Sequence, residues 1–163
     1  MTTKTKAFET KDALDLYKKI IYTEGKAGRR MDKKQIEEMI DLAIKQLGYS
    51  YAPYSHFHVG AALLAKNGTY YTGCNIENAA YTPTNCAERT AFFKAVSEGE
   101  RDFEAIAVVG GKDTPGFCTP CGVCRQVMAE FCDPKKFRII LMDNKGGTIT
   151  YLLEELLPAG FKL

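Results

Sequence analysis

The side chains best suited to catalysis in this 163-residue sequence lie in two short segments. The first reads CAE at positions 86–88 and the second reads PCGVC at positions 120–124. Three thiolates can hold a zinc ion and leave its fourth tetrahedral position for water, as a catalytic zinc site requires. A carboxylate two positions beyond Cys86 could take a proton from that water and deliver it elsewhere. The two segments therefore predict a catalytic metal site built from Cys86, Cys121, Cys124 and Glu88.

Both segments are expected to begin a helix after a loop. A helix N-terminus carries partial positive charge and unpaired N–H groups, which lower the pKa of a nearby thiol and favour the metal-binding thiolate. Cys121 and Cys124 are three positions apart, so they share one face of their helix. Arg89 is expected to hydrogen-bond a zinc-bound thiolate and offset the excess negative charge of three thiolates. An exposed arginine in the first turn of a helix is the alternative for Arg89.

Three other interpretations of the cysteines stay open at this point. A C-x-x-C pair alone is also typical of a redox site. Cysteines at 118, 121 and 124 resemble the start of an iron–sulfur motif, but Cys132 follows at the wrong distance and no proline comes directly after it. The strongest alternative is a closed structural zinc site that uses Cys86, Cys118, Cys121 and Cys124. Such a site would leave Glu88 without an evident task.

The elements that must position these residues follow from local patterns. Asp32 and Gln35 have the spacing of a capping box, and an apolar stripe follows them. Asn67-Gly68, set between two apolar runs, predicts a hairpin. The expected elements are helices over 11–24, 32–47, 86–98 and 121–131, a hairpin over 57–76, strands over 104–111, 137–142 and 146–150, and a final helical turn within 151–158. Helices that alternate with the later strands predict a mixed sheet sandwiched by helices.

Charge is distributed unevenly along the chain. Residues 1–34 hold ten Lys or Arg against five Asp or Glu, whereas residues 35–163 hold twelve against fifteen. We expect a basic helical N-terminal extension and linker over 1–30 and one catalytic domain over 31–163. The net charge of −3 on the main body disfavours nucleic acid as a partner. No apolar run approaches the roughly 20 residues that span a bilayer, and the start lacks the apolar core of a signal peptide, so we expect a cytoplasmic protein without membrane partners.

Five motifs in order carry a resemblance to a known family: PYSHFHVGAAL, GCNIENAAY, CAERTA, PCGVCRQV and ELLP. From about Ile36 to Phe161, the sequence resembles the small zinc-dependent cytidine deaminases of the homotetrameric type. The resemblance implies an α/β fold of three layers, α-β-α, in which helices flank a mixed five-stranded sheet. It also implies pyrimidine salvage, in which free cytidine or deoxycytidine is hydrolysed to uridine or deoxyuridine and ammonia.

The resemblance further implies the roles of individual residues. One Zn²⁺ per subunit would be held by Cys86, Cys121 and Cys124, with zinc-bound hydroxide attacking C4 of the pyrimidine and Glu88 shuttling protons. The implied substrate contacts are Phe57 against the base, Asn75 and Glu77 on the ribose, Tyr81 lining the site, the backbone near Ala87 at the polar edge of the base, and Phe161 reaching the site of a neighbouring subunit. A homotetramer with sites completed by neighbouring subunits is therefore expected.

The expected ribose contact also filters the substrate. A carboxylate such as Glu77 accepts well from a ribose hydroxyl and would repel a phosphate on that hydroxyl, which favours a free nucleoside over 3′-linked nucleic acid. Deaminases of blasticidin S share CAE, PCGxCRQ and ELLP, so deamination of another small molecule is one alternative. A non-catalytic structural zinc module with four cysteine ligands is the other.

Overall fold

The computed structural model describes residues 31–162. The helix expected over 11–24 and the linker that follows it lie outside the described residues. The division of the chain into an extension over 1–30 and a domain from residue 31 therefore stays a prediction. Among the described residues, no helix combines the length and the apolar character needed to cross a membrane.

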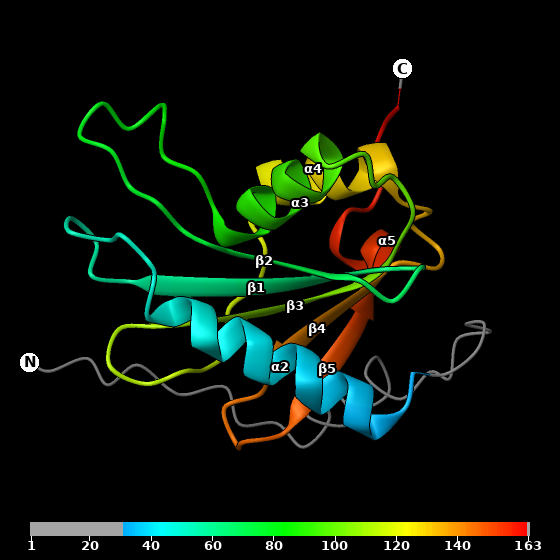
Figure 1. Ribbon diagram of the computed structural model, residues 1–163, viewed down its shortest axis with the longest axis horizontal. Helices are drawn as coiled ribbons and strands as arrows, with labels where there is room; N and C mark the ends of the chain where they lie inside the picture. Colours follow the sequence, from blue (N-terminus) through cyan, green and yellow to red (C-terminus); the bar gives the residue numbers. More distant parts are fainter. Residues whose placement is uncertain (1–30, 163) are drawn as a thin grey trace, which may run out of the picture.

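Four helices and five strands make up the described part of the chain (Figure 1). In chain order they are α2 (Lys33–Leu47), β1 (His58–Ala65), β2 (Tyr70–Cys74), α3 (Ala87–Ser97), β3 (Phe103–Gly111), α4 (Gly122–Phe131), β4 (Arg138–Met142), β5 (Thr148–Leu152) and α5 (Leu153–Leu156). This order agrees with the one that the sequence predicts after its first helix. The local signals also lie where they were expected: Asp32 caps α2 by accepting from the N–H of Gln35 at 2.7 Å, and Gly68 takes a φ of +90° in the hairpin turn.

The five strands form one mixed sheet in the order β2-β1-β3-β4-β5. Only β3 and β4 pair in parallel, and α4 is the crossover between them. The other neighbouring pairs are antiparallel. The predicted three-layer α/β arrangement is confirmed, because α3, α4 and α5 lie on one face of the sheet and α2 lies on the other (Figure 1).

Alternation along the strands gives the sheet two buried faces. On β1, Leu63 packs toward α3 and α4, while Leu64 packs toward α2. The same alternation separates Ile106 from Ala107 on β3. A strand with apolar side chains on both faces is stable only when both faces are covered, which explains why the central strands are continuous apolar runs.

The direction of the strands brings the two chemical segments together. Because β2 and β3 are both antiparallel to β1, they run the same way, and the chain leaves both at the same end of the sheet. Helices α3 and α4 follow these two strands on the same face, so their N-termini are neighbours (Figure 1). Close approach of α3 depends on Gly73 in β2, where an added Cβ would lie 2.6 Å from the carbonyl oxygen of Ala87.

Candidate active site

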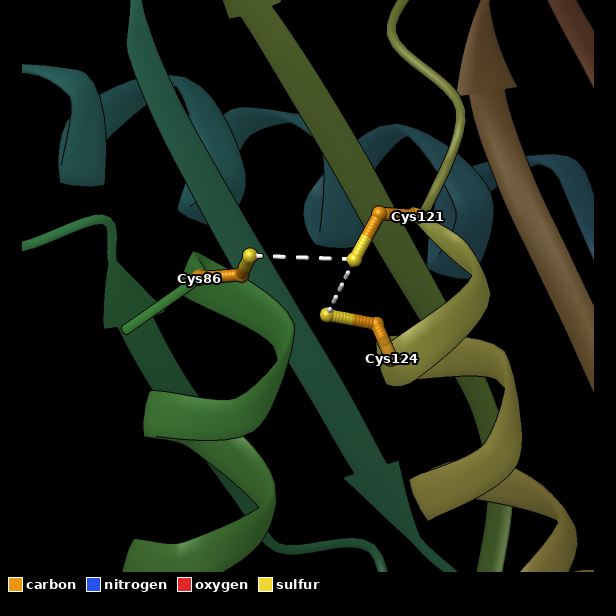
Figure 2. Close-up of side chains that lie close together, drawn as sticks. All are labelled: Cys86, Cys121 and Cys124. Carbon is orange, nitrogen blue, oxygen red and sulfur yellow. Dashed lines mark hydrogen bonds between the residues drawn. The ribbon is translucent and has the colours of Figure 1, made fainter. Parts of the chain in front are cut away.

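Three thiols meet where α3 and α4 begin. Figure 2 shows the side chains of Cys86, Cys121 and Cys124 pointing toward one another from the two helix starts. The Sγ atoms of Cys86 and Cys121 are 3.9 Å apart, those of Cys121 and Cys124 are 3.6 Å apart, and all three lie within 4.8 Å of one another. A tetrahedral zinc with bonds of about 2.3 Å to sulfur would separate its thiolates by about 3.8 Å. All three are free thiols, so the donor set fits zinc.

Both helices begin at a metal-ligand candidate. Cys86 and Cys121 are the N-cap residues of α3 and α4, each with extended backbone and no hydrogen bond from its side chain to the helix. Cys124 lies one turn into α4 and is buried. The hydrogen bond from the Cys124 thiol lowers the pKa of Cys86 to about 5, with a further contribution from Arg89. The site thus favours a thiolate at Cys86, which is the form that binds metal.

Glu88 lies beside the thiols as the second residue of α3. Its side chain is only 4% exposed, and it is the one charged residue that is buried among those the structure describes. Burial raises the pKa of Glu88 to about 7, with a further increase from the charge of Cys86. A carboxyl group that gains and loses a proton near neutral pH is well suited to general acid–base catalysis.

Arg89 and Cys118 surround the three thiols in different ways. One Nη atom of Arg89 is 3.6 Å from Sγ of Cys86 and donates to the carbonyl oxygen of Thr84 at 3.2 Å. Cys118 is half-buried, and burial raises the pKa of its thiol to about 11. Within residues 31–162, the cluster of potential metal ligands consists of the three thiols at 86, 121 and 124 and does not include Cys118. This geometry favours an open three-ligand site over a closed four-cysteine site.

Asn75 holds the loop that precedes β1. Its Nδ2 donates to the carbonyl oxygen of Phe57 at 2.8 Å, and its Oδ1 accepts from the backbone N–H of Val59 at 2.8 Å and from the hydroxyl of Ser50. Phe57 is half-buried and borders a cavity of about 400 Å³ beside the loop over 111–117. The side chain of Asn75 therefore fixes the backbone from the carbonyl group of Phe57 to the N–H of Val59, and one N–H of its amide remains for another acceptor.

Glu77 bonds the same loop through its carboxylate. One oxygen accepts from the backbone N–H of Tyr54 at 2.9 Å and from that of Ser55 at 3.3 Å. A hydrogen bond from the Ser55 hydroxyl and these backbone bonds keep the pKa of Glu77 below its usual value. Glu77 is therefore a carboxylate at neutral pH, held at the edge of the loop that carries Phe57.

The remaining expected site residues lie outside the thiol cluster of a single chain. Tyr81 is 80% exposed with a φ of +58°, and Phe161 is 65% exposed near the C-terminus. Ala87 is fully buried, so only its backbone could contact a substrate. The structure thus brings Glu88 and the thiols together and leaves both aromatic rings on the surface.

Two further residues support the site and were not assigned by the sequence analysis. Thr90 donates from its hydroxyl to the carbonyl oxygen of Cys74 at 3.0 Å, which ties α3 to the end of β2. Arg125 donates from Nε to the carbonyl oxygen of Pro120, directly before Cys121, at 2.7 Å. Thr90 lies in the motif CAERTA and Arg125 lies in the motif PCGVCRQV. Their place in these motifs is the sequence feature that could have identified them as site residues.

Comparison with known families identifies this arrangement. The model of the cytidine and deoxycytidylate deaminase zinc-binding region matches residues 33–140, which contain all three thiols and Glu88. This chain belongs to the cytidine and deoxycytidylate deaminase family. The predicted enzyme class is therefore confirmed: this chain is a hydrolase of the cytidine deaminase type, and the three thiols form a potential metal site.

Individual relatives support the same assignment. A cytidine deaminase of Sporosarcina psychrophila is 54% identical over 126 residues, which cover 77% of this chain and 90% of the relative. A cytidine deaminase of Halalkalibacterium halodurans is 51% identical, over 80% of this chain and 95% of the relative. The crystal structure of cytidine deaminase from Burkholderia pseudomallei superimposes with a TM-score of 0.71 at 44% identity, covering 80% of this chain and all of that chain. A blasticidin-S deaminase of Bacillus cereus is 31% identical over 74% of this chain and 88% of the relative, so that alternative is not favoured.

Proposed function

We propose that this chain hydrolyses free cytidine and deoxycytidine to the uridine nucleosides and ammonia, at a zinc held by Cys86, Cys121 and Cys124. The observation that carries the proposal is the meeting of three free thiols at two helix N-termini, beside the buried carboxyl group of Glu88. A structural zinc site would need a fourth ligand, and it would not need a buried carboxyl group next to the thiols.

Zinc held by these thiols would supply the Lewis acidity that makes a water molecule nucleophilic near neutral pH. Glu88 takes the proton that this water gives up and passes it to N3 of the pyrimidine. It then assists transfer of a proton to the departing amino group, so that ammonia leaves and C4 becomes a carbonyl. Arg89 donates to the Cys86 sulfur and moderates the negative charge of the three thiolates. The backbone at Ala87, beside Glu88, contacts the polar edge of the base.

The loop beside the thiols provides the nucleoside contacts. Phe57 packs against the base, and Asn75 and Glu77 bind the ribose hydroxyls. Asn75 contributes the N–H that its bonds to Phe57 and Val59 leave over, so it both binds the sugar and positions Phe57. Glu77 contributes a carboxylate oxygen, the stronger kind of acceptor for a hydroxyl.

A homotetramer completes these sites from neighbouring subunits. The exposed apolar surface of residues 31–162 supports a homotetramer. Its large exposed side chains are Tyr49, Tyr51, Tyr54, Ile76, Tyr81, Phe93, Phe117, Val123 and Phe161. Surfaces rich in exposed aromatic rings are typical of protein interfaces. In this assembly Tyr81 lines the site and Phe161 reaches the site of a neighbour.

The cytoplasm is the compartment that fits this protein. All six cysteines are free thiols, as the reducing conditions of the cytoplasm favour.

Glu77→Gln tests the nucleoside assignment. The amide oxygen of Gln can still accept from the backbone N–H groups of Tyr54 and Ser55, so the loop is kept while the negative charge is lost. A hydrogen bond to a charged group contributes about 1.5–3 kcal/mol, so we expect KM for cytidine to rise about 10- to 100-fold with a smaller change in kcat. We also expect the preference for cytidine over cytidine 3′-monophosphate to shrink, because repulsion of the phosphate is removed.

Steady-state kinetics with both substrates measure these effects. Glu130→Gln, which changes an exposed carboxylate on α4, is the matched control and should leave both KM values unchanged. An unchanged KM for cytidine in Glu77→Gln, together with unchanged discrimination against the 3′-phosphate, would show that Glu77 does not bind the ribose.

A further inference from the structure

Arg125 makes three hydrogen bonds that involve the backbone around Cys121, the N-cap residue of α4. Its backbone N–H donates to the carbonyl oxygen of Cys121 at 3.0 Å. Its Nε donates to the carbonyl oxygen of Pro120 at 2.7 Å, and its Nη1 donates to the carbonyl oxygen of Leu156 at 2.8 Å. One residue therefore bonds the carbonyl groups on both sides of the Cys121 α-carbon and joins them to the end of α5.

These bonds act on the backbone that aims the Cys121 thiol. The two peptide groups flanking an α-carbon set its φ and ψ, and thus the direction of its Cα–Cβ bond. Cys121 is an N-cap residue with no hydrogen bond from its side chain to the helix, and it is exposed at the end of an irregular loop. Cys86 has a comparable restraint from Thr90, whose backbone N–H donates to the carbonyl oxygen of Cys86 at 3.0 Å and whose hydroxyl oxygen lies 3.2 Å from the same atom. Arg125 restrains the backbone of Cys121 as Thr90 restrains that of Cys86.

The guanidinium group is suited to this task and an ammonium group is not. Its planar fork presents several N–H donors in fixed directions, so Arg125 can reach Pro120 and Leu156 at the same time. A lysine offers one compact charge on a flexible stem and cannot hold both carbonyl groups in that fixed geometry. The Leu156 carbonyl group that accepts from Arg125 is itself held in place, because α5 is packed on the core through the fully buried Leu153.

We propose that Arg125 is a positioning residue, which fixes the backbone of Cys121 so that its sulfur is held ready for the metal. This inference rests on the proposed function, in which zinc is bound by the three thiols. It assigns to Arg125 a role in metal binding and in turnover that does not require contact with the substrate or with the metal.

Arg125→Lys and Arg125→Gln test the proposal in the zinc-loaded protein. Arg101→Lys and Arg101→Gln are the matched controls, because Nη1 of Arg101 also donates to two backbone carbonyl groups, those of Val96 in the last turn of α3 and Glu100 just after it. Zinc affinity is measured by competition with a chromophoric chelator. The absorption bands of the cobalt-substituted proteins report the geometry of the thiolate ligands, and kcat and KM are measured at saturating zinc.

Removing a group that orients a metal ligand typically costs 10- to 100-fold in metal affinity or activity. We therefore expect both Arg125 variants to bind zinc about 10- to 100-fold more weakly, to show altered cobalt bands, and to lose kcat with little change in KM. The Arg101 variants should match the wild type in all three. Arg125→Lys keeps the charge and the aliphatic stem, so it decides the question if Arg125→Gln does not fold.

Two results would separate failure of this proposal from failure of the proposed function. Wild-type zinc affinity and wild-type cobalt bands in Arg125→Lys would overturn the positioning role while leaving the deaminase intact. A wild-type protein that neither binds zinc nor deaminates cytidine would overturn the proposed function, and the positioning role with it.

Discussion

Glu88→Gln is expected to lower kcat for cytidine by about 10²- to 10⁴-fold, the range that a positioned general acid–base group contributes. Glutamine has nearly the same shape as glutamate, but it cannot take a proton from water and return it to the pyrimidine. Glu88 is almost completely buried, and burial disfavours its charged form. The neutral side chain should therefore fit without loss of stability, so the melting temperature should not fall and bound zinc should stay at the wild-type level.

The measurements are kcat by loss of cytidine absorbance, zinc content by atomic absorption, and melting temperature by circular dichroism. Glu98→Gln is the matched control, because it makes the same chemical change at the exposed C-cap of the same helix. It should keep wild-type turnover. Full turnover in Glu88→Gln with zinc bound would rule out Glu88 as the proton carrier.

Cys121→Ala is expected to abolish stable zinc binding and turnover together. Its sulfur lies 3.9 Å from that of Cys86 and 3.6 Å from that of Cys124, within reach of a metal ion bound by all three. Two thiolates would remain, which is one fewer protein ligand than catalytic zinc sites use. The loss in affinity should exceed the 10- to 100-fold range that is typical of residues outside the ligand set. Because Cys121 is exposed, its replacement should leave the core packed.

Cys118→Ala distinguishes the open site from a closed four-cysteine site. Cys118 is near the cluster in sequence, but it is not one of the mutually close thiols. We expect Cys118→Ala to keep one zinc per chain, wild-type zinc affinity and wild-type kcat. Zinc loss in Cys118→Ala equal to that in Cys121→Ala would instead establish four cysteine ligands and exclude the open position that the hydrolysis needs.

Features that depend on neighbouring residues were predictable from the sequence. The capping of α2 by Asp32 and the turn at Gly68 arise within a few positions, so local spacing is sufficient. The N-caps at Cys86 and Cys121 belong to the same class, since each thiol sits where a loop ends and an apolar periodic segment begins. The boundaries were less accurate. The hairpin was expected over 57–76, whereas β1 begins at His58 and β2 ends at Cys74.

Contacts between distant positions were not predictable in the same way. Asn75 bonds Ser50 from 25 positions away, and Arg125 bonds Leu156 from 31 positions away. The chain meets itself at these points only after the sheet has formed, so no local pattern identifies the partner. The convergence of the thiols is an intermediate case: the motifs named the residues, and the common direction of β2 and β3 brings them together.

Zinc-dependent conversion of cytidine to uridine is the measurement that tests the proposed function most directly. The purified protein is incubated with cytidine, and the ultraviolet absorbance is followed before zinc removal by a chelator, after removal, and after zinc is restored. We predict conversion by the zinc-loaded protein, none by the stripped protein, and recovery on adding zinc. A folded, zinc-loaded protein that leaves cytidine and deoxycytidine unchanged would contradict the proposed reaction, and equal rates with and without zinc would contradict the role of the metal.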